Sequence, residues 1–135
     1  MRTKYLLPTI LCCLFIFALT ASRFATGEST LAFIQNHIMP DYNSAVALNA
    51  FLRKSAHVAV FGILAILTDF LLRRKSAVSW LLTTLYAAAD EIHQMYMPGR
   101  TASIMDVLLD SLAALLFLTI LQFLHPPKEK RADRS

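Results

Sequence analysis

Four long apolar runs, separated by short clusters of charged residues, limit what this chain can fold into. The runs are residues 5–22, 55–72, 76–97 and 103–124. A run of about 20 apolar residues matches the hydrocarbon core of a bilayer, which is about 30 Å thick. Hydrophobic residues make up 56% of only 135, more than a soluble domain of this length can bury. We therefore predict an all-α integral membrane bundle of four transmembrane helices, in one domain over residues 1–125.

The first apolar run has a second interpretation, because a short basic start followed by an apolar segment also marks a cleaved signal peptide. This run is long for a signal peptide, and Leu19 fits poorly three residues before a cleavage after Ala21. Further apolar runs follow it as well. We therefore expect a retained transmembrane helix.

Two segments are expected to lie outside the membrane core. Residues 23–52 contain the turn formers Gly27, Pro40 and Asp41, and residues 30–39 within them predict a short interfacial helix. The spans should thus be joined on one side by a partly helical loop. The charged tail, residues 126–135, is predicted to be disordered.

The distribution of lysine and arginine predicts the orientation. With four spans, one side of the membrane receives nine of these residues and the other side receives four. Because cytoplasmic loops carry an excess of lysine and arginine, both termini should be cytoplasmic. The loop at residues 23–52 and the turn at residues 98–102 then face outward.

Ionisable and polar side chains gather at the outer ends of three predicted spans. They are Arg53, Lys54 and His57 in the second span, Asp90, Glu91, His93 and Gln94 in the third, Arg100 in the turn, and Ser103, Asp106 and Asp110 in the fourth. A charge at mid-bilayer costs about 2.5–3.5 kcal/mol on insertion scales, so such residues usually face the interior of a bundle. We therefore predict that they surround one polar pocket.

The residue types suggest two roles within this pocket. Histidines and carboxylates can exchange protons, which makes four residues catalytic candidates: His57, Asp90, Glu91 and His93. The others suit the binding of an anionic substrate group. These substrate-binding candidates are Arg53, Lys54, Gln94, Arg100, Ser103 and Asp106.

Alternatives to a functional pocket remain at the same positions. Arg100 could pair with Asp106, and Lys54 with Glu91, which would only hold the helices together. A divalent metal ion is a further alternative, but the spacing around His93 is not that of a His-Glu-x-x-His helix, so we expect no cofactor. At the other membrane face, Asp69 is expected to pair with Arg73, four residues later.

The segments that contain these polar residues also resemble those of a known protein family. The chain is similar to the VanZ-like family of bacterial membrane proteins in the segments Arg53-Lys54-Ser55-Ala56-His57, Asp90-Glu91-Ile92-His93-Gln94 and Pro98-Gly99-Arg100, and at Ser103 and Asp106. It departs from the family pattern at Asp110 and Ala113, where asparagine and glycine are usual, and at Val60 and Phe61, where an acidic residue and a tyrosine are frequent.

The resemblance implies a protein of the bacterial cytoplasmic membrane with a role in the cell envelope. Founding members of the family are associated with low-level resistance to teicoplanin-type glycopeptides, but the resemblance supplies no reaction. The expected partners are the lipid bilayer and a lipid-linked or cell-wall-related anionic ligand, and no nucleic acid. We carry three hypotheses: a binding protein for that ligand, a membrane-embedded hydrolase or transferase acting on a lipid headgroup, and, least supported, a proton-coupled transporter.

Overall fold

The computed structural model describes residues 3–21, 27–97 and 102–126, and in this part of the chain it is all-helical, as predicted. Its helices are α1 (Thr3–Ala21), α2 (Gly27–His37), α3 (Tyr42–Leu71), α4 (Ser76–Gln94) and α5 (Ile104–Leu124). Helix α2 corresponds to the short helix predicted between the first two spans. The predicted disorder of the tail concerns residues that, apart from Pro126, lie outside the described ones.

Three of these helices, α1, α3 and α5, are long and apolar enough to cross a membrane. Helix α4 has 19 residues but is not among them. Three of the four predicted crossings are therefore supported by helix length and composition. The crossing by α4 stays a prediction.

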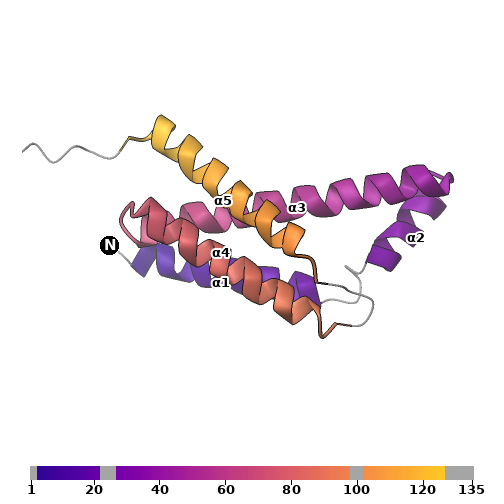
Figure 1. Ribbon diagram of the computed structural model, residues 1–135, viewed down its shortest axis with the longest axis horizontal. Coiled ribbons are helices and arrows are strands. Elements are labelled where there is room, and N and C mark those ends of the chain that lie inside the picture. The colour runs from indigo at the N-terminus through magenta and orange to yellow at the C-terminus, as the bar shows by residue number, and fades with distance from the viewer. Residues whose placement is uncertain (1–2, 22–26, 98–101, 127–135) are drawn as a thin grey trace, which may run out of the picture.

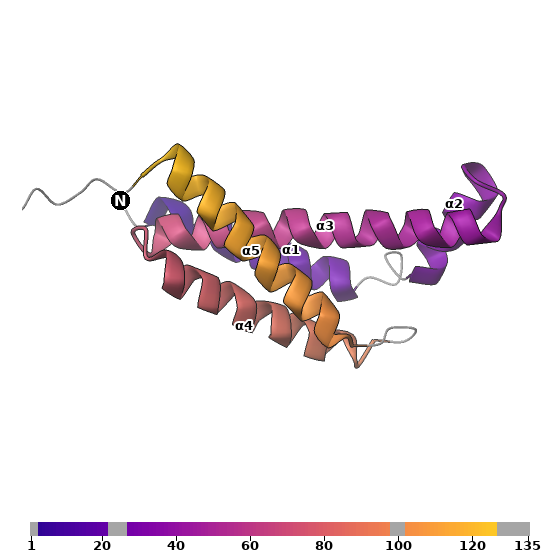
Figure 2. The ribbon, with the colours of Figure 1, turned by 45° about the horizontal axis from the view of Figure 1, so that its top comes forward.

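The four long helices lie side by side, with α1 and α4 running in one direction and α3 and α5 in the other (Figures 1 and 2). Helix α3 has 30 residues and is about 45 Å long at 1.5 Å per residue. Its first half extends past the ends of α1, α4 and α5, and α2 folds back along this extension (Figure 2). The chain thus has a four-helix bundle at one end and a pair of helices at the other.

Small residues allow α3 and α5 to approach closely. Ala65 and Ala114 are fully buried and cluster with Leu118. A methyl group added at Gly62 would lie 2.5 Å from the ring of Phe117, so the contact requires glycine. Helices in lipid associate by such close packing, because the lipid itself is as apolar as a leucine side chain.

Helix α4 places its polar residues inside the bundle and its apolar residues outside. Ser79, Thr83 and Asp90 are buried, whereas Leu81 and Leu85 are about half exposed. This is the reverse of a helix on the surface of a soluble protein. It also explains why α4 is less apolar than its neighbours, since its polar side chains contact helices and not lipid.

The turn between α3 and α4 corrects one prediction. Asp69 does not pair with Arg73 but with Arg74, whose Nη1 lies 3.0 Å from Asp69 Oδ2. Helix α3 ends at Leu71, and Arg73 and Arg74 have φ angles of 58° and 65°, so helical i, i+4 geometry does not apply. Arg74 also donates to the carbonyl oxygen of His125, at 2.7 Å, and so joins this turn to the end of α5.

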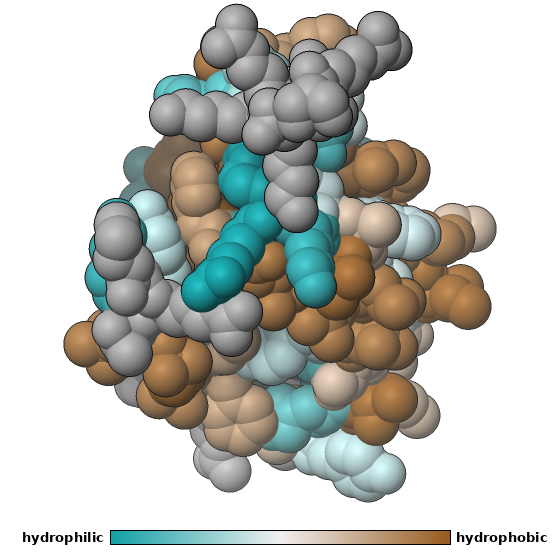
Figure 3. Space-filling model, turned by 90° about the vertical axis from the view of Figure 1, so that its left-hand side faces the viewer, coloured by the Kyte–Doolittle hydropathy of each residue, from teal (hydrophilic) through white to brown (hydrophobic). Residues whose placement is uncertain are grey.

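The end of the molecule that carries this turn is shown in Figure 3. Hydrophilic residues lie near the middle of the view, and hydrophobic residues flank them. Such a pattern is typical of the end of a membrane bundle, where loops meet water and the sides meet lipid.

Candidate functional site

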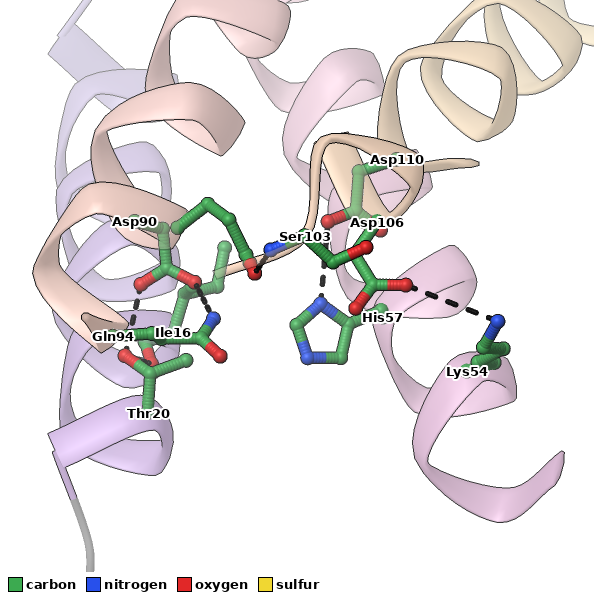
Figure 4. Close-up of polar contacts among 10 residues, drawn as sticks. Ile16, Thr20, Lys54, His57, Asp90, Gln94, Ser103, Asp106 and Asp110 are labelled. Carbon is green, nitrogen blue, oxygen red and sulfur yellow. Dashed lines mark hydrogen bonds and ion pairs between the residues drawn. The ribbon is translucent and has the colours of Figure 1, made fainter. Parts of the chain in front are cut away.

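Polar side chains meet at the other end of the bundle, where α1, α3, α4 and α5 come together. Figure 4 shows two groups: His57, Asp110, Asp106 and Lys54 on one side, and Asp90, Gln94 and Thr20 on the other. Each group joins two helices. The described polar side chains thus lie at one end of the bundle, but they form two groups and do not all surround one pocket.

The first group is built on a contact between α3 and α5. His57 Nδ1 lies 3.2 Å from Asp110 Oδ2, and the Asp110 residue is only 3% exposed. The second carboxylate oxygen of Asp110, Oδ1, is buried and has no hydrogen-bond partner among the described residues. The sequence predicts Asp110 at the pocket but indicates neither a catalytic nor a substrate-binding role for it. Its position one turn after Asp106 was the available signal.

A cavity of about 130 Å³ opens beside this pair. Five of the predicted site residues line it together with Asp110, namely Arg53, Lys54, His57, Gln94 and Asp106. Ala50 and Leu109 complete the wall. The structure thus gathers residues from α3, α4 and α5 around one space, as a ligand site requires.

The cations of the cavity are only weakly neutralised. Lys54 Nζ lies 3.9 Å from Asp106 Oδ1, and the two side chains are 62% and 38% exposed, so water screens the pair. This is a different partner from Glu91, which we had considered for Lys54. Within the described part of the chain, no carboxylate lies within 4.0 Å of the Arg53 guanidinium.

The second group holds α4 against α1. Asp90 is buried, and its two carboxylate oxygens accept hydrogen bonds from Thr20 Oγ1 at 2.8 Å and from Gln94 Nε2 at 2.9 Å. The predicted i, i+4 relation of Asp90 and Gln94 is therefore a direct contact. Because Gln94 also lines the cavity, it connects the two groups.

Among the described candidates, Glu91, His93 and Ser103 also do not line the cavity. The ring of His93 stacks on Phe17 of α1, with the ring centroids 4.3 Å apart. Glu91 Oε1 accepts a hydrogen bond of 2.6 Å from the backbone N–H of Ser103, the N-cap residue of α5. A carboxylate at a helix N-terminus is stabilised by the helix dipole. Arg100 lies outside the described residues.

The geometry of His57 suits proton transfer. When Asp110 Oδ2 accepts the Nδ1 proton, a neutral imidazole keeps its lone pair on Nε2. Figure 4 shows this second ring nitrogen pointing away from Asp110. A carboxylate that orients a histidine in this way is the usual support of a general base.

The catalytic candidates therefore do not form one cluster: His57 contacts Asp110, whereas Asp90 contacts Thr20 and Gln94. As to metals, the described residues contain no group of three or more His, Cys, Asp or Glu side chains that could hold an ion.

Comparison with known proteins identifies the family. The family model described as VanZ/LLP1 matches residues 5–125. The chain belongs to the VanZ/LLP1 family. No curated protein and no solved structure gave a match. Membership of this family, together with the three apolar helices, indicates a multi-pass membrane protein of the bacterial envelope.

Proposed function

We propose that this VanZ/LLP1 protein binds the anionic group of a lipid-linked or cell-wall-related molecule in the cavity beside His57. The proposal rests on one observation: the same small cavity contains two complementary features. The guanidinium of Arg53 has no carboxylate partner among the described residues, and Asp110 Oδ1 is a buried acceptor that no described group satisfies. A ligand with an anionic group and a nearby hydroxyl or amine would satisfy both.

Arginine is the appropriate residue for such a group. Its planar guanidinium can donate two parallel hydrogen bonds to a phosphate or carboxylate, and it stays charged at every physiological pH. Lys54, at the edge of the same cavity, adds a second positive charge whose exposed pairing with Asp106 costs little to break.

The proposal places the cavity at the outer face of the cytoplasmic membrane, which requires α4 to be the fourth crossing. With 19 residues, α4 is about 28 Å long and so close to the thickness of the hydrocarbon core. It runs opposite to both α3 and α5 (Figure 1), and its exposed surface includes Leu81, Leu82 and Leu85. The basic turn at residues 73–75 then lies on the cytoplasmic side, at the opposite end from the cavity.

The test uses a soluble probe that carries only the anionic group. We expect purified protein to bind glycerol phosphate, and Arg53→Ala to weaken this binding by about tenfold or more, since a charge-assisted contact is worth about 1.5–3 kcal/mol. Arg53→Lys should lose less. Lys75→Ala, an exposed cation at the other end of the bundle, is the matched control and should bind as the unchanged protein does. Equal binding by Arg53→Ala and Lys75→Ala would refute the proposal.

A contribution to teicoplanin-type resistance is part of the same proposal and has its own test. Expression of the protein in a susceptible bacterium should raise the inhibitory concentration of teicoplanin, and Arg53→Ala should abolish the increase at equal abundance in the membrane. If Arg53→Ala protects as well as the unchanged protein, the cavity has no part in resistance.

A second candidate function, hydrolysis or transfer at a lipid headgroup, is favoured by the contact between His57 and Asp110. In this mechanism His57 Nε2 removes a proton from the attacking water or hydroxyl, and Asp110 holds the ring in the required tautomer. An enzyme would lose turnover in His57→Gln while still binding glycerol phosphate. A change in binding alone, with no product from any lipid phosphate tested, would favour the binding protein.

A further inference from the structure

A second, larger space lies beside the polar cavity, between α2 and the first half of α3. This groove has a volume of about 530 Å³. Its walls are mainly apolar and are formed by Ser29, Thr30, Phe33, Ile34, Ile38, Asn49, Leu52, Arg53 and Ala56. The helices that form it, α2 and the first half of α3, lie on the part of the molecule that extends past the four-helix bundle (Figure 2).

Specific contacts hold α2 in place along this groove. Thr30 Oγ1 donates to Asn49 Oδ1 at 2.7 Å, and Asn49 Nδ2 donates to the carbonyl oxygen of Gly27 at 2.9 Å. Ile34 is buried against α3. By contrast, Phe33 and Ile38 are more than half exposed, although both line the groove. The helix is thus attached by a few residues, and an apolar surface beside them is left open.

The groove and the polar cavity share a wall. Arg53 lines both of them. Its guanidinium reaches toward α2, because a Cβ atom added at Gly27 would lie only 2.6 Å from Arg53 Nη1. Ala56, one turn along α3, lines the groove and also a small apolar cavity that borders His57. The apolar groove therefore adjoins the cationic, hydrogen-bonding cavity at Arg53.

We infer that the groove between α2 and α3 holds the hydrocarbon chain of a lipid whose anionic headgroup occupies the polar cavity. The inference rests on the proposed function and names the class of ligand: an amphiphile with a phosphate or similar group next to its chain. Arg53 would sit at the junction of headgroup and chain. A soluble anion would use the cavity but would leave the groove without an occupant.

A lipid fits these walls better than a peptide does. A bound peptide needs partners for its backbone N–H and C=O groups, whereas most of the groove wall is hydrocarbon. The helices that form the groove extend past the bundle, beyond the outer face at which the proposal places the cavity (Figure 2). A chain that enters the groove therefore leaves the bilayer, and the apolar walls shield it from water while Arg53 holds the headgroup.

The test compares the binding of a lipid with the binding of its headgroup alone. It uses variants that narrow the groove but do not change a residue of the cavity wall. Protein is placed in phosphatidylcholine nanodiscs that contain a small fraction of phosphatidic acid, and the lipids retained after release are counted by native mass spectrometry. Ala56→Leu adds bulk at the junction of the groove. Ala32→Leu, an exposed position on α2 that does not line the groove, is the matched control.

We expect Ala56→Leu to reduce the retention of phosphatidic acid by about tenfold and to leave glycerol phosphate binding unchanged. Ala32→Leu should change neither. Ile38→Asn, which changes an exposed groove residue without disturbing a buried contact, should act in the same direction and guards against misfolding of Ala56→Leu. Unchanged retention in both groove variants would overturn the inference and leave the proposed function standing. If neither phosphatidic acid nor glycerol phosphate binds the unchanged protein, the proposed function itself fails.

Discussion

The contact between His57 and Asp110 can be measured as a coupling free energy. Hydrogen bonds between membrane helices are worth about 0.6 kcal/mol on average, whereas bonds to a charged group are worth about 1.5–3 kcal/mol. The two side chains are 24% and 4% exposed, so the pair is largely shielded from water. We therefore expect a coupling in the upper range, about 1.5–3 kcal/mol.

The assay is a double-mutant cycle on the free energy of unfolding, measured at equilibrium in mixed detergent micelles. The cycle uses His57→Leu, Asp110→Leu and the double variant. The single changes should each leave one polar group buried without its partner, and the double change should cost less than their sum. The expected interaction energy is the coupling given above.

A control cycle pairs Asp110→Leu with His93→Leu. His93 lies against Phe17 of α1 and makes no contact with Asp110, so these two changes should be additive within about 0.5 kcal/mol. The same additivity in the His57 cycle would refute the pairing and remove the support for a His57 general base.

Three further predictions concern the fold. Gly62→Ala should lower the free energy of unfolding by about 1–3 kcal/mol, because its methyl group meets the ring of Phe117, and Phe117→Leu should restore part of the loss. A hydrogen bond from Ser44 lowers the pKa of Asp41, the N-cap of α3, below its ordinary value. The stability that this cap contributes is complete above the ordinary pKa of aspartate and is lost as the pH falls through the lowered pKa. Thermal melts of Asp41→Ala should lack this contribution at all pH values. Reporter fusions at the C-terminus and in the loop before α2 should report cytoplasmic and external positions respectively, and the opposite result for the C-terminus would mean an odd number of spans.

The amino-acid sequence alone determined that this chain is a helical membrane protein with polar residues at one end. Hydrophobic length and the placement of lysine and arginine are properties of consecutive residues, so α1, α2, α4 and α5 could be located to within a few residues. Helix α3 differs, because it begins at Tyr42 and not at Ser55, where the second span was predicted to start. The position of His57, Asp90 and Asp106 toward one end of the bundle also followed from sequence, because the rise per residue in a helix is constant.

Only the tertiary structure decided which of these residues contact one another. Gln94 faces the cavity, whereas His93, its neighbour in the chain, stacks on α1, because adjacent positions on a helix point about 100° apart. The contact between His57 and Asp110 depends on how closely α5 approaches α3, which Gly62 and the buried alanines permit. Asp69 pairs with Arg74 since the turn reverses the chain through two left-handed residues. Helix rotation, helix spacing and turn conformation result from packing between distant segments, and no local pattern in the sequence encodes them.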